Sequence, residues 1–207
     1  MEFLKGRDLV DHVRADQLLP PATVVSIGIQ VAQALAYAHA QNVVHRDIKP
    51  ANIMYEPQSQ AVKVTAFGIA RITDSSRTRT GMILGTPSYM SPEQIAGRRA
   101  DGRSDLYALG VTLFQLLTGE LPFRGDSMAE LMYKISNQEA PDLCSLRPEL
   151  PPALAAVLAR ALAKRPEARF ADGEAFAAEL RACLPLVDGL AVAARPVDLP
   201  LHAEAAA

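Results

Sequence analysis

The segment from Leu106 to Leu117 is apolar on almost every side. A helix at a protein surface carries its apolar residues along one stripe, so this segment predicts a helix that is buried all round. A buried helix must be covered by other elements, and apolar residues recur at helical spacing in further segments. These segments are 22–40, with Val24, Gly28, Val31, Leu35 and His39 on one stripe; 131–135, after the capping box Ser127–Glu130; 154–162; and the segment with Phe176 and Leu180, after the cap Asp172. The chain is therefore predicted to be α-rich and built around 106–117.

Two stretches break the helical pattern. Between 43 and 65 the short apolar runs 43–44, 52–55 and 61–64 alternate with polar stretches, which predicts small strands in two β-hairpins. Residues 71–88 are rich in Ser, Thr, Arg and Gly and have no periodicity, which predicts a long loop of the kind that often carries function. The predicted fold class is α-rich α+β.

The composition excludes several classes of protein. A hydrophobic share of 49% with 21% charged residues is typical of a globular domain, and 5% aromatic residues predict an aliphatic core. Lys and Arg number 21 against 23 Asp and Glu, so there is no positive surplus for nucleic acid. Cys144 and Cys183 are too few for a disulfide framework or a zinc site, which indicates reduced thiols in a cytoplasmic chain. No uninterrupted run of eighteen apolar residues occurs, so no membrane segment is predicted.

Residues with chemical potential concentrate in the octapeptide His45-Arg46-Asp47-Ile48-Lys49-Pro50-Ala51-Asn52. In isolation, Asp47 or Lys49 would be an ordinary surface charge and His45 a packed core histidine. Three further motifs follow in order: Val62-Lys-Val-Thr-Ala-Phe-Gly-Ile-Ala-Arg71, Gly85-Thr-Pro-Ser-Tyr-Met-Ser-Pro-Glu93 and Ser104-Asp-Leu-Tyr-Ala-Leu-Gly110. Together the four motifs resemble the catalytic loop and the following segments of protein kinases. The amino-acid sequences of these motifs are similar to those of bacterial Ser/Thr kinases of the eukaryotic-like type.

This resemblance implies a phosphoryl-transfer site, where the protein mainly positions a hydroxyl group and neutralises phosphate charge. By resemblance, Asp47 would accept the proton of the substrate hydroxyl and Lys49 would steady the γ-phosphate. Asn52 would hold a magnesium ion through its amide oxygen, and Thr86 would lie near Asp47 and help to select Ser or Thr. The implied cofactors of the parent kinase are ATP and Mg, and the implied partner is a protein substrate or another kinase.

The resemblance also implies structural roles. His45 and Phe67 would stack inside the domain. Asp105 would tie the buried helix to the backbone of the catalytic loop. Glu93 would form an ion pair with Arg169.

One residue departs from the family pattern at the metal site. Where the family has Asp-Phe-Gly, this chain has Ala66-Phe67-Gly68. The missing carboxylate is the principal magnesium ligand, and alanine offers no oxygen to a cation that prefers oxygen ligands. Asn52 alone cannot replace that charge, so the chain is expected to be catalytically inactive. An alanine that keeps the packing intact fits both a deliberate knockout and a natural pseudokinase.

The second departure concerns the extent of the resemblance. No Gly-rich loop over the phosphates and no strand lysine of the family pattern are found, so the N-lobe is expected to be absent. Residues 1–7 resemble the hinge segment and 8–185 the helical C-lobe, while 186–207 are expected to form a flexible tail or linker. Adenine contacts would come from Glu2, Leu4 and Met54. ATP binding by this chain is therefore expected to be weak or absent.

Two hypotheses from different classes follow. In the first, the chain is a fragment or knockout of an ATP-dependent Ser/Thr kinase, and only the full parent with a small lobe and an aspartate at position 66 catalyses. In the second, it is a non-catalytic pseudokinase module that binds a protein partner. In both cases a face with Phe67 and Met54 would be bare, so self-association is expected. By resemblance, Thr78 or Thr80 would be phosphorylated, and the phosphate would pair with Arg46.

Overall fold

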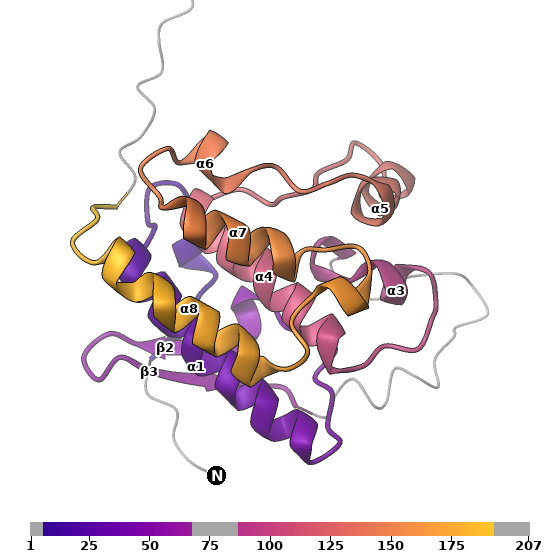
Figure 1. Ribbon diagram of the computed structural model, residues 1–207, viewed down its shortest axis with the longest axis horizontal. Helices are drawn as coiled ribbons and strands as arrows, with labels where there is room; N and C mark the ends of the chain where they lie inside the picture. The colour runs from indigo at the N-terminus through magenta and orange to yellow at the C-terminus, as the bar shows by residue number, and fades with distance from the viewer. Residues whose placement is uncertain (1–5, 68–86, 193–207) are drawn as a thin grey trace, which may run out of the picture.

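The computed structural model describes residues 6–67 and 87–192 (Figure 1). The described elements follow one another in this order: β1 (Arg7–Asp8), the 3-10 turn η1 (Asp11–Val13), α1 (Pro21–Ala40), η2 (Pro50–Asn52), β2 (Ile53–Glu56), β3 (Ala61–Val64), η3 (Pro87–Tyr89), α3 (Pro92–Ile95), α4 (Gly102–Thr118), α5 (Met128–Asn137), α6 (Leu143–Leu146), α7 (Pro152–Ala161), η4 (Pro166–Ala168) and α8 (Gly173–Val187). The predicted α-rich class with a small β component is confirmed.

Helix α4 is the buried central helix that the apolar pattern predicts. Every residue from Ser104 to Phe114 is buried. The helix begins after Asp101, whose carboxylate accepts a hydrogen bond from the backbone N–H of Arg103 at 2.9 Å. It ends at Gly119 with φ of +77°, a left-handed conformation that glycine adopts without steric cost.

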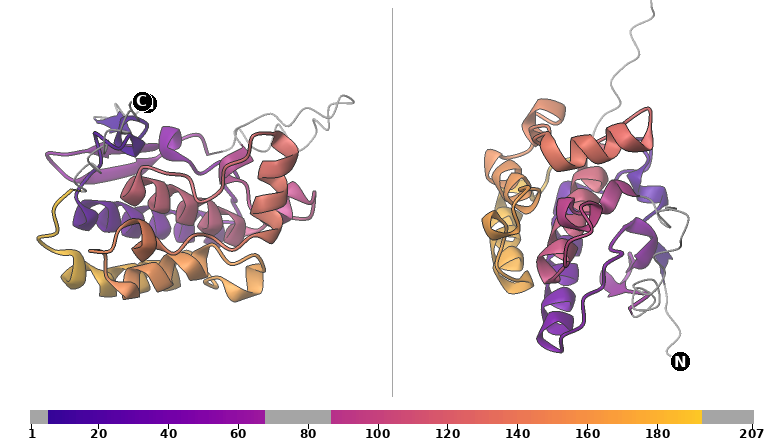
Figure 2. Two further views of the ribbon diagram at one scale, coloured as in Figure 1. Left: turned by 90° about the horizontal axis from the view of Figure 1, so that it is seen from above. Right: turned by 90° about the vertical axis from the view of Figure 1, so that its right-hand side faces the viewer.

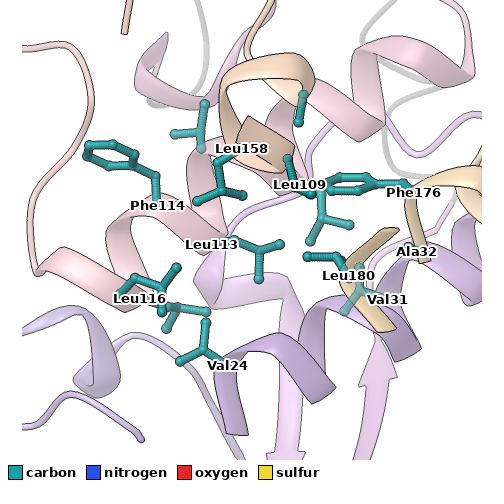
Figure 3. Packing of buried hydrophobic residues seen from close by; sticks show 14 of the residues in the cluster. Val24, Val31, Ala32, Leu109, Leu113, Phe114, Leu116, Leu158, Phe176 and Leu180 are labelled. Atoms are coloured by element: carbon teal, nitrogen blue, oxygen red, sulfur yellow. The ribbon is translucent and has the colours of Figure 1, made fainter. Parts of the chain in front are cut away.

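The elements form three layers around this helix. Figure 2 shows the strands on one side, α1 beside α4 in the middle, and α7 with α8 on the other side. Helices α1 and α4 come close together because Gly28 faces Leu113, and a Cβ at Gly28 would lie 2.9 Å from the Leu113 Cδ1 atom. Figure 3 shows the core where these helices meet, with Val24 and Val31 from α1, Leu109, Leu113 and Leu116 from α4, Leu158 from α7, and Phe176 and Leu180 from α8.

The strands form one antiparallel sheet in the order β1-β2-β3, where two separate hairpins were predicted. Ile53 pairs with Val64, and Tyr55 pairs with both Val62 and Arg7. The prediction of strands at 52–55 and 61–64 is confirmed, but β1 adds a partner that the sequence did not indicate.

The predicted strand at Val43-Val44 is wrong. The backbone N–H of Val43 donates to the Ala38 carbonyl at the end of α1, at 2.9 Å. The next buried residue, His45, donates its backbone N–H to the Asp105 carboxylate at 2.8 Å. Because these amides bind α1 and α4, they are not available for a strand ladder.

Both predicted helix caps are present. The Ser127 hydroxyl accepts from the backbone N–H of Glu130 at 3.1 Å, and the Asp172 carboxylate accepts from Ala175 at 2.8 Å. The predicted start of the tail at residue 186 is too early, because α8 continues to Val187, whose side chain is fully buried. Residues 193–207 lie outside the described residues.

Helix α1 is long and apolar enough to cross a membrane by length and composition. However, 56% of this stretch is buried inside the fold, where α1 packs against α4 and α8. A central helix of a folded core meets the same criteria, and α1 has that position here.

Replacing Tyr107 by phenylalanine is expected to stabilise the fold. The Tyr107 hydroxyl is buried and has no hydrogen-bond partner within the described residues, while its ring faces the Arg169 guanidinium at 4.9 Å. An unsatisfied buried polar group costs about 1–3 kcal/mol, so Tyr107→Phe should raise the free energy of unfolding by about 1 kcal/mol. Urea denaturation of both forms measures this, and a loss of stability would show that the hydroxyl is satisfied in solution.

Candidate active site

The octapeptide 45–52 forms a loop between α1 and β2 that brings together two predicted catalytic side chains, Asp47 and Lys49, and one predicted metal ligand, Asn52. Asp47 is exposed, and its Oδ2 atom lies 2.9 Å from the Lys49 ammonium group. The Asn52 amide nitrogen donates to the same Oδ2 atom at 3.0 Å and to the Asp47 backbone carbonyl at 2.7 Å. The Asn52 Oδ1 atom makes no hydrogen bond to the described part of the chain, so it is the atom of this residue available to a metal ion.

The backbone of the loop is hydrogen-bonded to Asp105 of α4. This carboxylate is buried and accepts from the backbone N–H groups of His45 at 2.8 Å and Arg46 at 2.7 Å. It also contacts the Nε2 atom of His39 at 2.8 Å. Asp105 therefore links the buried helix to the loop backbone, as the resemblance implies. The contribution of His39 was missed, because its place on the α1 stripe indicated packing alone.

His45 connects the loop to the segment after β3. The His45 side chain is fully buried, and its Nε2 atom lies 2.7 Å from the Thr65 carbonyl oxygen. Its ring meets Phe67 edge-on, with centroids 4.6 Å apart at 74°. The two rings that were expected to stack are therefore in contact in a T-shaped arrangement, and Phe67 remains 38% exposed.

Ala66 lies between Thr65 and Phe67 at the position of the missing carboxylate. Its φ angle is +64°, in the left-handed region that Asp and Asn tolerate better than alanine. The side chain has no oxygen, and the described residues contain no cluster of three His, Cys, Asp or Glu side chains that could hold a metal ion. Asn52 and Asp47 alone form an incomplete donor set for Mg²⁺, which prefers octahedral oxygen ligands.

Glu93 and Arg169 form a buried two-pronged ion pair. The two guanidinium nitrogens donate to the two carboxylate oxygens at 2.7 and 2.8 Å, and the Ser104 hydroxyl donates to Glu93 at 2.6 Å. Burial raises the pKa of Glu93, but the hydrogen bonds and the charge of Arg169 outweigh this effect and leave the pKa below its ordinary value. The pair joins α3 to the segment between α7 and α8.

The remaining predicted site residues divide into two groups. Met54 is half-buried on β2, opposite Asp8 of β1 and Lys63 of β3. Arg46 is half-buried in the loop and has a left-handed φ of +68°. The predicted residues Glu2, Leu4, Thr78, Thr80 and Thr86 lie outside the described residues.

The fold and this loop together define a protein-kinase-like domain. The protein kinase domain family matches residues 1–180, and the chain belongs to this family. The match covers the octapeptide, the helices α3 and α4 that hold it, and about half of α8.

Bacterial Ser/Thr kinases are among the relatives of the chain. Serine/threonine-protein kinase pkn3 of Myxococcus xanthus is 47% identical over 192 residues, which cover 88% of this chain and 35% of the relative. Serine/threonine-protein kinase PknB of Mycolicibacterium smegmatis is 41% identical, with 89% of this chain and 29% of the relative covered. Among solved structures, the Mycobacterium tuberculosis PknI kinase domain superposes with a TM-score of 0.66 at 34% identity, covering 88% of this chain and 63% of that chain. The chain thus spans about a third of the length of these curated relatives.

Proposed function

We propose that the parent kinase of this chain, with a small lobe and an aspartate at position 66, transfers phosphate from ATP to Ser or Thr side chains of proteins. We further propose that the 207 residues alone do not catalyse this transfer. The observation that supports both parts is the loop itself. Asp47, Lys49 and Asn52 converge there. Ala66 follows Thr65, whose carbonyl oxygen contacts His45, and it lacks the carboxylate that the metal requires.

The loop supports the first part of the proposal through the positions of its charges. The exposed Asp47 carboxylate can accept a proton from a substrate hydroxyl that approaches from solvent. Lys49 neutralises the same region, and in a working site its ammonium group would turn toward a phosphate. An exposed ion pair of this kind contributes about 1 kcal/mol or less, so the exchange of partners costs little.

A non-catalytic role as a binding module has one observation in its favour. Ala66 removes a metal ligand, yet the contacts that build the lobe, including Asp105 to the loop and Glu93 to Arg169, are intact. A domain that has lost transfer but kept its scaffold can still present a surface to a protein partner. This pseudokinase reading predicts partner binding without any transfer.

The 207-residue chain is expected to transfer no phosphate above background, because its donor set for Mg²⁺ is incomplete. Radiolabelled transfer to a generic protein substrate measures this, with Asp47→Asn as the matched control. Both forms should give the same background. Transfer by the unmodified chain that is lost in Asp47→Asn would refute the proposal of inactivity.

Phosphorylation by an active kinase of the same type is expected at Thr78 or Thr80. These residues precede the Gly85-Thr86 motif. A phosphate on either threonine would carry nearly two negative charges and would pair with Arg46. Mass-spectrometric mapping after incubation with an active relative measures the sites. Modification confined to other positions would contradict the prediction.

A further inference from the structure

Gln94 of α3 has a hydrogen bond to the catalytic loop that none of the kinase motifs assigns. Its Oε1 atom accepts from the Ser91 backbone N–H at 3.0 Å and from the Ser91 hydroxyl at 3.1 Å. Its Nε2 atom donates to the Arg46 carbonyl at 3.3 Å. The Ser91 N–H is only a donor and the Arg46 carbonyl only an acceptor, so these two partners fix the orientation of the amide group.

This bond completes a ring of contacts between α3, α4 and the loop. Glu93 and Gln94 are neighbours on α3, and Ser104 and Asp105 are neighbours on α4. Ser104 donates to Glu93 at 2.6 Å, while Asp105 accepts from the Arg46 N–H at 2.7 Å. The bond from Gln94 to the Arg46 carbonyl joins these two contacts, so both backbone groups of Arg46 are bound to separate helices.

Arg46 needs this support because of its backbone conformation. A φ of +68° is unfavourable for a side chain of this size and persists only where surrounding contacts fix it. Asp47 is the next residue, so the conformation of Arg46 determines where the Asp47 carboxylate points. Release of one side of Arg46 would let the loop relax toward a commoner conformation.

We propose that Gln94 is a positioning residue that holds the Arg46 backbone and thereby fixes Asp47. The proposal rests on the proposed function in that Asp47 is the group to be positioned. Because Gln94 acts through the Arg46 backbone, a shift of α3 changes the direction of the Asp47 carboxylate without a direct contact between Gln94 and Asp47.

A comparison of two variants tests this in the 207-residue chain. Gln94→Glu keeps an oxygen that can accept from Ser91, and a carboxylate suits the first turn of a helix, but it cannot donate to Arg46. Ser91→Ala removes the contacts of the Ser91 hydroxyl with the Gln94 amide oxygen and with the Gln94 backbone N–H, and it keeps the bond from Gln94 to Arg46. Amide hydrogen exchange resolved by NMR is measured for residues 45–49, with amides of α4 and α8 as internal controls.

Gln94→Glu should speed exchange of the loop amides about fivefold, which corresponds to the loss of one ordinary hydrogen bond, and leave α4 and α8 unchanged. The Arg46 carbonyl ¹³C resonance should move upfield, and Ser91→Ala should change neither readout. Unchanged loop exchange in Gln94→Glu, or equal acceleration in Ser91→Ala, would overturn the proposal. If Gln94→Glu loosens the whole fold, Gln94→Met is judged by the same criterion, and a general loosening in both variants would also overturn it. Neither readout requires nucleotide or transfer, so the outcome is independent of whether the proposed function is correct.

Discussion

Phosphate transfer should appear only when two changes are combined. These are Ala66→Asp and the fusion of a small lobe from a bacterial Ser/Thr kinase relative in front of the chain. The combined form is expected to reach a kcat of about 1–100 s⁻¹, the usual range for protein kinases. The unmodified chain and each single change should stay near background.

The physical reason is that metal, phosphate-binding groups and base act as one unit in transfer, so their effects are not additive. Ala66→Asp supplies the carboxylate but leaves the phosphates without a Gly-rich loop. The small lobe supplies that loop and nucleotide contacts near Met54, but the metal still lacks its main ligand. The backbone accommodates the new aspartate, because the left-handed φ of +64° at position 66 suits Asp better than Ala.

Radiolabelled transfer to a generic protein substrate by the four forms provides the measurement. The control is Asp47→Asn in the combined form, which should return transfer to background. Transfer by the combined form that survives Asp47→Asn would show that another group acts as the base. No transfer by a folded, nucleotide-binding combined form would count against the kinase proposal itself.

Arg169→Met should cause a large loss of stability. The Arg169 guanidinium is buried, pairs with both oxygens of Glu93, and also donates to the carbonyl groups of Ala163, Lys164 and Arg103. Removal of one partner leaves the other charge buried without compensation, which costs about 3–5 kcal/mol. Urea denaturation measures the loss. Arg165→Met is the matched control, since Arg165 is 83% exposed and 3.8 Å from Glu167, and it should cause no measurable change.

The cost of Arg169→Met should shrink in acid. The pKa of Glu93 in the folded wild type lies below its ordinary value of 4.5, so the pair contributes stability above that value and loses it as the pH falls through the folded pKa. In the variant the buried Glu93 carboxylate has no compensating positive charge, so its pKa should rise. Protonation at low pH should then remove the free-energy cost of the buried negative charge. A difference between variant and wild type that stays constant from pH 7 to about pH 4 would contradict this account.

The helical part of the fold was predictable because its signals are local. The apolar run 106–117 and the stripe of α1 follow from side-chain spacing, and the caps Ser127 and Asp172 follow from short-range hydrogen bonding. The sheet was less predictable. The strand β1 has two residues and forms only because β2 offers a free edge, which no local pattern reveals.

The candidate site shows the same division. Asp47, Lys49 and Asn52 lie within one octapeptide, so the motif brings them together. His39 supports the loop by contacting Asp105, and Gln94 contacts the loop itself at Arg46, both across large separations in sequence. Their types are compatible with an ordinary helix surface, and only the packing of α1, α3 and α4 reveals what they bind.

The attachment of the loop through Asp105 has a consequence for how such a protein can evolve. The groups that hold the loop backbone come from α4 and α3, whereas the Asp47 carboxylate, the proposed base, is exposed to solvent. Substitutions at Asp47, Asn52 or position 66 therefore remove few of the contacts that keep the domain above its stability threshold. Activity can be lost by a single substitution while the folded domain persists. Selection for partner binding can then maintain a domain that no longer catalyses phosphate transfer.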